Sequence, residues 1–402
     1  PHKATGPDNI SAQFLKSTAN IISPALTLIF NASLHQGRLP SQWKDANVVP
    51  LFKKGDRSLA SNYRPVSLTS ICCKMLEHII FTNSMHHLER FSILTDLQHG
   101  FRSKRSSESQ LILTVHDLAT GLKDNEQMDA IMLDFSKAFD KVPHKRLLHK
   151  LSYCGIRGAN LKWIENFRSD RTQQVVLDGT LSDSASVTSG VPQGTVLGPL
   201  LFLCYINDLP ESVSSSVRLF ADDCLLHKRI RTVRDCHLLQ QDLTSLQQWE
   251  DSWLMSFNPS KCETLRVSLK TPRKIIDFTY SIRNTPLKLV NSAKYLGVTI
   301  SSKLEWKPHI SKVTKKANST LGLLRRNLRT CPLPMKKLAY LSFVRPTLEY
   351  ASTIWSPYWE EDIAEVEAVQ RRAARFMCRD YSPFSSPTEM LHRLSLCLLY
   401  TS

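Results

Sequence analysis

Hydrophobic residues recur at helical spacing in several long stretches of the chain. These predicted helices lie at 11–35, 68–90, 106–123, 144–168, with a break marked by Gly155 and Gly158, and 232–256. Shorter runs that are apolar, or alternate between apolar and polar positions, predict strands at 47–56, 130–135, 173–179, 185–191, 262–268 and 293–301. From about residue 306 onward the pattern is again helical. Helices and strands mixed without strict alternation predict an α+β fold with an all-helical C-terminal part.

Two adjacent carboxylates stand out within this pattern. The run SVRLFADDCLLH predicts a strand, a turn and a second strand, with Asp222 and Asp223 at the tip, and Asp134 ends the apolar run AIMLD upstream. Neighbouring carboxylates repel each other, and burying either one unpaired costs several kcal/mol. A divalent cation would neutralise them, and oxygen ligands without Cys or His favour Mg²⁺ over zinc. Taken alone, the pair could equally be a solvated turn.

Composition and charge narrow the class of protein. The 42% apolar content is enough for a core, and the apolar stretches at 21–30 and 196–206 are too short to span a bilayer, so we expect both in the core. Ten cysteines without zinc-type spacing indicate reduced, mostly buried thiols in an intracellular protein. The net charge of +16 favours a polyanionic partner, nucleic acid first. Residues 303–345 carry eleven Lys and Arg against one acid, Glu305.

Seven segments occur in an order that resembles one family. They are NYRPVSL (62–68), QHGFRSKRSS (98–107), LDFSKAFDKVPH (133–144), SGVPQGTVLGPLLF (189–202), FADD (220–223), NPSKCE (258–263) and KYLGVTI (294–300). Together they resemble the reverse transcriptase of non-LTR, LINE-type retrotransposons, with jockey-like and chicken-repeat-like elements the nearest, from residue 1 to about 380. The chain starts inside a motif, so we expect a fragment.

The resemblance implies a right-hand polymerase fold with an antiparallel, ferredoxin-like palm. Fingers would span 1–127, the palm 128–302 with part of the fingers between about 145 and 185, and a helical thumb with the start of a C-terminal region 303–402. The implied metal ligands are the carboxylates of Asp134, Asp222 and Asp223 and the backbone carbonyl of Phe135, which together hold two Mg²⁺, with Mn²⁺ as a substitute. Asp140, in the same motif as Asp134, is expected to act only as an ion-pair or capping residue.

The resemblance also assigns the other site residues. Lys261 would protonate the leaving pyrophosphate, although a lone lysine normally faces solvent. Phe139 would exclude a 2′-hydroxyl by steric contact, the alternative being an ordinary core side chain. The full nucleotide-binding set is Lys53, Lys54, Arg64, Arg102, Phe135, Phe139, Gln193 and Gly194. Gln98 and Phe101, which precede Arg102 in QHGFR, would contact template or nucleotide. The primer- and template-binding set is Tyr295, Leu296, Gly297, Lys315, Lys316, Arg325 and Arg326.

The implied function is RNA-directed DNA polymerase, which extends a primer 3′-hydroxyl with deoxynucleotides by two-metal catalysis. The expected partners are an RNA template, a DNA primer, deoxynucleotides and the element RNA in a ribonucleoprotein, located in nucleus and cytoplasm without membrane association. One alternative is a decayed or repurposed copy that binds RNA without catalysis. Another, an RNA-dependent RNA polymerase, is disfavoured by Phe139 and by Ala221, where such enzymes more often place glycine.

Overall fold

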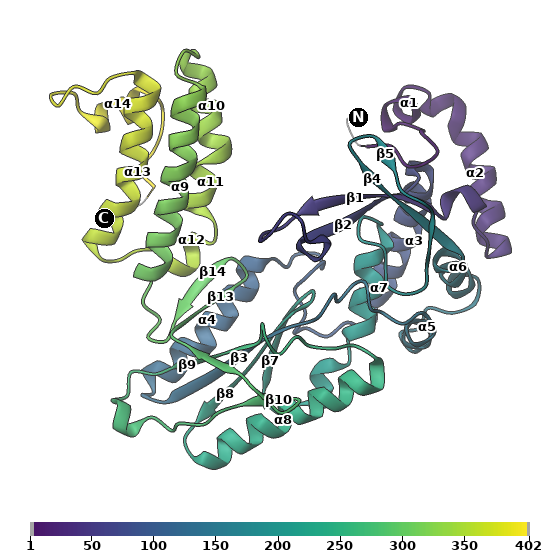
Figure 1. Ribbon diagram of the computed structural model, residues 1–402, viewed down its shortest axis with the longest axis horizontal. Coiled ribbons are helices and arrows are strands. Elements are labelled where there is room, and N and C mark those ends of the chain that lie inside the picture. The colour runs from purple at the N-terminus through teal and green to yellow at the C-terminus, as the bar shows by residue number, and fades with distance from the viewer. Residues whose placement is uncertain (1–3, 400–402) are drawn as a thin grey trace.

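The computed structural model of the protein describes residues 4–399. Within that range the chain builds an N-terminal sheet with helices, a central sheet and a C-terminal helical region, which follow one another across Figure 1. No helix between residues 4 and 399 is long and apolar enough to cross a bilayer.

The N-terminal part surrounds a sheet with strand order β2-β1-β4-β5, and β6 pairs with β4. Its elements are α1 (Ala12–Ser17), α2 (Ala19–Gln36), β1 (Asp45–Phe52), β2 (Tyr63–Leu68), α3 (Ile71–Arg90), α5 (His144–Tyr153), α6 (Gly158–Arg168), β4 (Arg171–Leu177), β5 (Thr180–Leu181), β6 (Ala185–Val187) and α7 (Leu197–Ile206). The parallel pairing of β4 with β1 brings the segment after α6 back to this sheet.

The central sheet has the order β12-β9-β3-β8-β7 and carries the candidate site. The elements of this part are α4 (Ser107–Lys123), β3 (Gln127–Asp134), β7 (Ser216–Phe220), β8 (Asp223–Ile230), α8 (Val233–Trp253), β9 (Glu263–Val267), β10 (Ser281–Ile282), β11 (Thr285–Pro286), β12 (Lys288–Val290), β13 (Ser292–Tyr295) and β14 (Val298–Ser301). Strand β3 lies in the middle and is buried on both faces. Ile131 and Leu133 pack into the core shared with α7, whereas Met128 and Ala130 pack toward the C-terminal helices. Burial on both faces explains why this strand reads as a continuous apolar run.

The C-terminal region is entirely helical. It contains α9 (Lys307–Asn327), α10 (Leu333–Phe343), α11 (Arg345–Glu349), α12 (Ser352–Trp355), α13 (Glu360–Cys378) and α14 (Pro387–Arg393). Figure 1 shows these helices standing beyond the β13–β14 hairpin, away from the N-terminal sheet.

Most predicted elements are confirmed, and three predictions need correction. The helix predicted at 11–35 is divided at Thr18, which ends α1 and precedes α2. The helix predicted from residue 68 begins at Ile71, because residues 63–68 form strand β2 against β1. The strand predicted at 293–301 is a hairpin that turns at Leu296 and Gly297, both with positive φ.

The two apolar stretches predicted to lie in the core differ in burial. Helix α7 is buried along its whole length, as predicted for residues 196–206. The prediction that 21–30 lies in the core is wrong for part of the helix, since Ile21 is 83% and Leu28 73% exposed. Helix α2 packs on one side only, through Leu26 and Phe30. All ten cysteines are free thiols and seven are buried, as their spacing predicted.

Candidate active site

Three carboxylates lie at one end of the central sheet. Strands β3 and β8 pair antiparallel with Asp134 directly opposite Asp223, and Asp222 occupies the two-residue connection between β7 and β8. Opposite residues in such a pair have Cβ atoms roughly 5 Å apart. The strand register therefore brings together residues that are 88 positions apart in the sequence.

Burial and mutual repulsion raise the pKa of two of the carboxylates. Burial first, and then the charges of Asp222 and Asp134, raise the pKa of Asp223 to about 6. Burial also raises the pKa of Asp222, with a contribution from Asp134, while the cations Arg64 and Lys53 oppose the shift. Asp223 keeps contact with solvent, so water screens part of this repulsion. The free site is thus short of positive charge.

Lys261 supplies one cation to this end of the sheet. The segment after α8 is fixed to the end of β3, because the Asn258 N–H donates to the Asp134 carbonyl at 2.7 Å and the Lys261 N–H donates to the Asn258 carbonyl at 2.9 Å. This turn places the Lys261 Nζ 3.0 Å from Asp134 Oδ2, with the lysine side chain 60% exposed. An exposed ammonium beside a site carboxylate is free to exchange one anionic partner for another.

The donor set suits a hard divalent cation. Within residues 4–399, no three acidic, His or Cys side chains converge into a ready metal-binding group. The three aspartates nevertheless offer oxygen ligands, two of them have a raised pKa, and the third, Asp134, has only an exposed lysine against its Oδ2. Oxygen donors of this kind suit Mg²⁺ or Mn²⁺. The Phe135 ring stacks on Phe257 in the core, with centroids 4.3 Å apart, so only its backbone could reach an ion.

Gln98 holds the turn that carries Asp222, a role that the sequence did not reveal. Its side-chain oxygen accepts from the Ala221 N–H at 2.9 Å and from the Gly100 N–H at 2.7 Å, and its Nε2 donates to the Ala221 carbonyl at 3.3 Å. Ala221 has a φ of 52°, which is costly for a residue with a Cβ. A Cβ on Gly100 would lie 2.2 Å from the Ala221 nitrogen, so only glycine fits there. Gln98 and Gly100 therefore fix the strained turn from one side.

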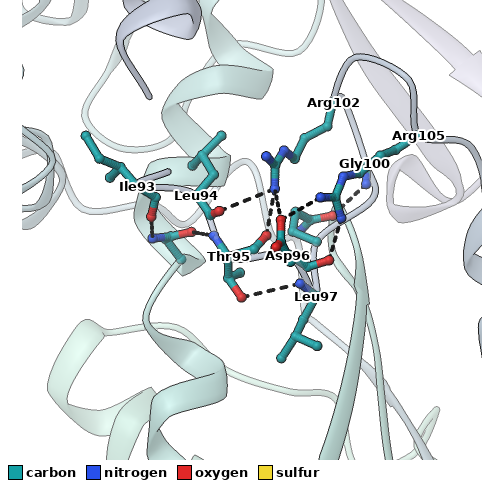
Figure 2. A network of polar contacts seen from close by, with 10 residues as sticks. Ile93, Leu94, Thr95, Asp96, Leu97, Gly100, Arg102 and Arg105 are labelled. Carbon is teal, nitrogen blue, oxygen red and sulfur yellow. Dashed lines mark hydrogen bonds and ion pairs between the residues drawn. The ribbon is translucent and has the colours of Figure 1, made fainter. Parts of the chain in front are cut away.

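Arg102 does not point to a nucleotide, and its predicted role is corrected. Its Nη1 donates to the carbonyls of Leu94 and Thr95 at 3.3 and 2.7 Å, and lies 3.8 Å from Asp96. Figure 2 shows this guanidinium turned into the loop, with Arg105 on the other side of Asp96. The Arg102 side chain is 9% exposed and burial lowers its pKa. Arg102 stabilises the loop that presents Gln98.

The basic turn after β1 places cations that act on the carboxylates. Leu51 pairs with Arg64 across β1 and β2, and Lys53 follows at the end of β1. Arg64 and Lys53 both lower the pKa of Asp222. The side chains of Arg64, Lys53 and Lys54 are exposed.

Phe139 and the VPQG loop are held by packing and by hydrogen bonds. The Phe139 ring stacks on Phe202 with centroids 4.4 Å apart, and one side remains partly exposed. The Gln193 Nε2 donates to Asp140 Oδ1 at 3.3 Å, and the Gln193 carbonyl accepts from the Ser67 N–H of β2 at 2.7 Å. Asp140 thus anchors this loop through a hydrogen bond, where an ion pair or cap was expected.

Gly194 faces the backbone of the N-terminal sheet. It has a φ of 111°, and a Cβ there would lie 2.5 Å from the Ser67 carbonyl oxygen. The glycine is required for this close approach. The Val191 N–H also donates to the Phe139 carbonyl at 2.7 Å, so this loop joins the N-terminal sheet to the segment that follows β3.

The YLG turn differs from its expected role at one residue. Tyr295 is 4% exposed and belongs to the core, so its side chain does not face a primer. Leu296 and Gly297 form the exposed turn, where the Tyr350 hydroxyl donates to the Leu296 carbonyl at 2.8 Å. A Cβ on Gly297 would lie 2.9 Å from the Tyr350 ring.

The four cations predicted to grip the duplex all lie on α9 and are exposed. Lys315 and Lys316 occupy its middle, and Arg325 and Arg326 its C-terminal end. The Arg325 guanidinium lies 5.5 Å from the centre of the Tyr381 ring.

Comparison with known proteins agrees with this geometry. The family model for reverse transcriptase (RNA-dependent DNA polymerase) matches residues 52–300, more than half of the chain, and the chain belongs to this family. The match contains Asp134, Asp222, Asp223 and Lys261. The protein thus has the α+β right-hand polymerase fold, and its similarity is to the enzymes of non-LTR retrotransposons.

Two curated relatives come from mobile elements of Drosophila melanogaster. The probable RNA-directed DNA polymerase from transposon BS is 29% identical over 392 residues, and the RNA-directed DNA polymerase from mobile element jockey is 26% identical over 388 residues. Each alignment covers 93% of this chain and 42% of the relative. The chain therefore spans less than half the length of these relatives. A solved apo telomerase from Candida tropicalis is similar over 90% of this chain and 63% of its own, with a TM-score of 0.49 and 12% identity.

Proposed function

We propose that this protein is an RNA-directed DNA polymerase of a non-LTR retrotransposon. It extends a primer 3′-hydroxyl on an RNA template with deoxynucleotides. The observation that carries the proposal is the register of β3 and β8, which sets Asp134 opposite Asp223, with Asp222 in the adjoining turn. Intact carboxylates at all three positions disfavour the alternative of a copy that only binds RNA.

The carboxylates and Lys261 divide the chemistry between them. Asp134, Asp222 and Asp223 would hold two Mg²⁺ or Mn²⁺, together with the Phe135 carbonyl. When bound, these ions activate the primer hydroxyl and stabilise the charge on the leaving pyrophosphate. Lys261 exchanges Asp134 for the pyrophosphate and donates a proton to it from Nζ. This exchange is supported by the exposed Lys261 side chain and its 3.0 Å contact with Asp134.

The nucleotide lies between the N-terminal sheet and the carboxylates. Arg64 and Lys53 bind its β and γ phosphates, supported by their electrostatic effect on Asp222. Phe139 lies beneath the sugar, held by its stack on Phe202, and rejects a 2′-hydroxyl by contact. Gln193 and Gly194 position template and nucleotide, fixed by Asp140 and β2.

The polymerase is divided into fingers, palm and thumb. Residues 1–127 with part of 145–185 form the fingers, 128–302 the palm, and 303–402 the thumb and the start of a C-terminal region. Leu296 and Gly297 support the primer strand, and Lys315 and Lys316 bind the template–primer backbone. In the cell the protein acts in a ribonucleoprotein with its element RNA, in nucleus and cytoplasm.

Primer extension by the purified chain tests the proposal. Deoxynucleotides should be incorporated on a primed RNA template, ribonucleotides should not, and Asp222→Asn should abolish extension while primer–template binding stays near wild type. Asp183→Asn removes the same charge from an exposed position between β5 and β6 of the N-terminal sheet, and this variant should extend normally. Extension by Asp222→Asn at the wild-type rate would overturn the assignment of the carboxylates.

A further inference from the structure

A cationic cavity lies at the far end of the C-terminal helices. It has a volume of about 960 Å³ and is bounded by the end of α9, the start of α10 and the end of α13. Helix α9 has 21 residues and is about 30 Å long, and it starts just after the β13–β14 hairpin beside the central sheet (Figure 1). The cavity is therefore well separated from the carboxylates.

The lining of this cavity is strongly basic. Its described lining contains five cations and no carboxylate: Arg325, Arg326, Arg329, Lys336 and Arg379. In the described part of the C-terminal region, ion pairs form at Lys307 and Arg345 and not at these five residues. The Arg379 guanidinium donates to the carbonyls of Arg329 and Cys331, and none of the five cations has a carboxylate partner among the described residues.

Lys336 is the strongest sign that an anion belongs in the cavity. Its side chain is 1% exposed, and its Nζ lies 5.1 Å from the centre of the Phe376 ring. Burial and the neighbouring Arg379 lower the pKa of this ammonium. A buried cation without a carboxylate partner destabilises the free protein. An anion entering the cavity would remove that penalty.

An exposed aromatic ring borders the same cations. Tyr381 lines the cavity, is 55% exposed and lies beneath the Arg325 guanidinium. Unpaired bases stack on aromatic rings and guanidinium planes, whereas the bases of a duplex are already stacked. Arginine also binds phosphate in a bidentate manner that lysine cannot match. Cations beside an exposed ring fit a single strand better than a duplex.

We infer that this cavity binds a single-stranded segment of RNA, outside the primer–template duplex held by the palm. Phosphates of the strand contact the arginines and Lys336, and a base stacks on Tyr381. The inference rests on the proposed function, since the strand is the unpaired part of the template. Arg325 and Arg326, which the sequence assigned to the primer–template duplex, are thereby assigned to the single strand.

Binding measurements with matched variants test the inference. The triple variant Arg325→Gln, Arg326→Gln, Arg329→Gln is compared with the control Arg273→Gln, Lys274→Gln and Lys288→Gln, which removes the same charge from exposed positions elsewhere. The probes are a labelled 20-nucleotide RNA, the same sequence as DNA, and a primed duplex with one unpaired template nucleotide. Affinity is measured by fluorescence anisotropy across a salt series.

The cavity variant should bind the single-stranded RNA at least tenfold more weakly than the control does. Three lost contacts should also flatten its log–log salt dependence by about 2, at about 0.7 per contact with a single strand. The short duplex should bind both variants alike. The inference would be overturned if the cavity variant and the control variant lost the same affinity for single-stranded RNA. It would also be overturned if the cavity variant lost as much affinity for the duplex as for single-stranded RNA. A third outcome would also overturn it: the wild-type protein binds RNA and DNA with equal affinity, and millimolar inorganic phosphate displaces the RNA completely. That result would indicate a site for any small anion.

Lys336→Met provides a second and independent readout. It keeps the stem and removes the buried charge, so the free variant should melt at a higher temperature than wild type while binding single-stranded RNA more weakly. A gain in stability without a loss of RNA affinity would overturn the role of Lys336. The triple arginine variant and Lys336→Met should both still extend the short primed duplex at the wild-type rate. If the wild-type protein does not extend that duplex, the proposed function is wrong. The binding measurements with single-stranded RNA test the cavity independently of that result.

Discussion

Replacing Gln98 by alanine should stop the polymerase without touching a carboxylate. Gln98 is 2% exposed, and its amide makes three hydrogen bonds, two with Ala221 and one with Gly100. Alanine leaves two buried N–H groups without partners, at about 1–3 kcal/mol each. The turn loses the contact that holds Ala221 at a positive φ, which itself costs about 1–2 kcal/mol. The turn can then relax and displace Asp222.

A displacement of that kind should appear in turnover. Misplacement of a reacting group by about 1 Å costs on the order of 100-fold in rate. We therefore expect kcat for single-nucleotide extension to fall about 100-fold in Gln98→Ala, with the KM for primer–template changed little. Rapid-quench extension at saturating nucleotide measures the rate, and thermal melting measures the loss of stability.

Gln127→Ala is a matched control for the effect on stability. Gln127 is also fully buried, and its side chain also makes three hydrogen bonds. Two are with the carbonyl and the N–H of Ile276, and one is with the carboxylate of Asp129. It begins β3, seven residues before Asp134, so it lies about 23 Å from the carboxylates. Both variants should melt at lower temperature than wild type, and only Gln98→Ala should lose turnover. Comparable turnover in the two folded variants would refute a positioning role for Gln98.

Three further perturbations address other residues of the site. Phe139→Ala should admit ribonucleotides by opening space below the sugar, measured as the ratio of ribonucleotide to deoxynucleotide incorporation; an unchanged ratio would make Phe139 a core residue only. Lys261→Gln should slow the chemical step while leaving nucleotide affinity near wild type, and a defect confined to affinity would contradict proton donation. Asp223 has a folded-state pKa of about 6, above its ordinary value of 3.8. Its ionisation therefore opposes folding, and the unfolding free energy of the metal-free protein should fall as pH rises from about 4 to 6. Denaturation of Asp223→Asn across this range should show a smaller fall, and parallel curves would contradict the shift.

The sequence by itself determined the local elements and the identity of the carboxylates. Periodicity defines α4 and α8, and the continuous apolar run of β3 follows from burial on both faces of the sheet. The FADD turn between two apolar strands places Asp222 and Asp223 at a hairpin tip. These features depend on residues a few positions apart in the chain, so the pattern of residues along the sequence is sufficient to predict them.

Local pattern was insufficient where packing decides the outcome. Strand β2 carries Pro65 and polar residues and is recognisable only through its pairing with β1. The apolar face of α2 stays exposed because α2 packs on one side only. Arg102 has the charge of a phosphate ligand, yet the loop around it takes up its donors.

Only the tertiary structure decided which distant groups meet. The Gln98 amide reaches Ala221 across 123 positions, and the cavity gathers Arg325 and Arg379 from two helices. Sequence patterns report the period of a single element, whereas these contacts depend on strand register and helix packing over long chain separations. The chemistry of the site was therefore readable from the sequence, while the support that holds its turn in place was set by the fold.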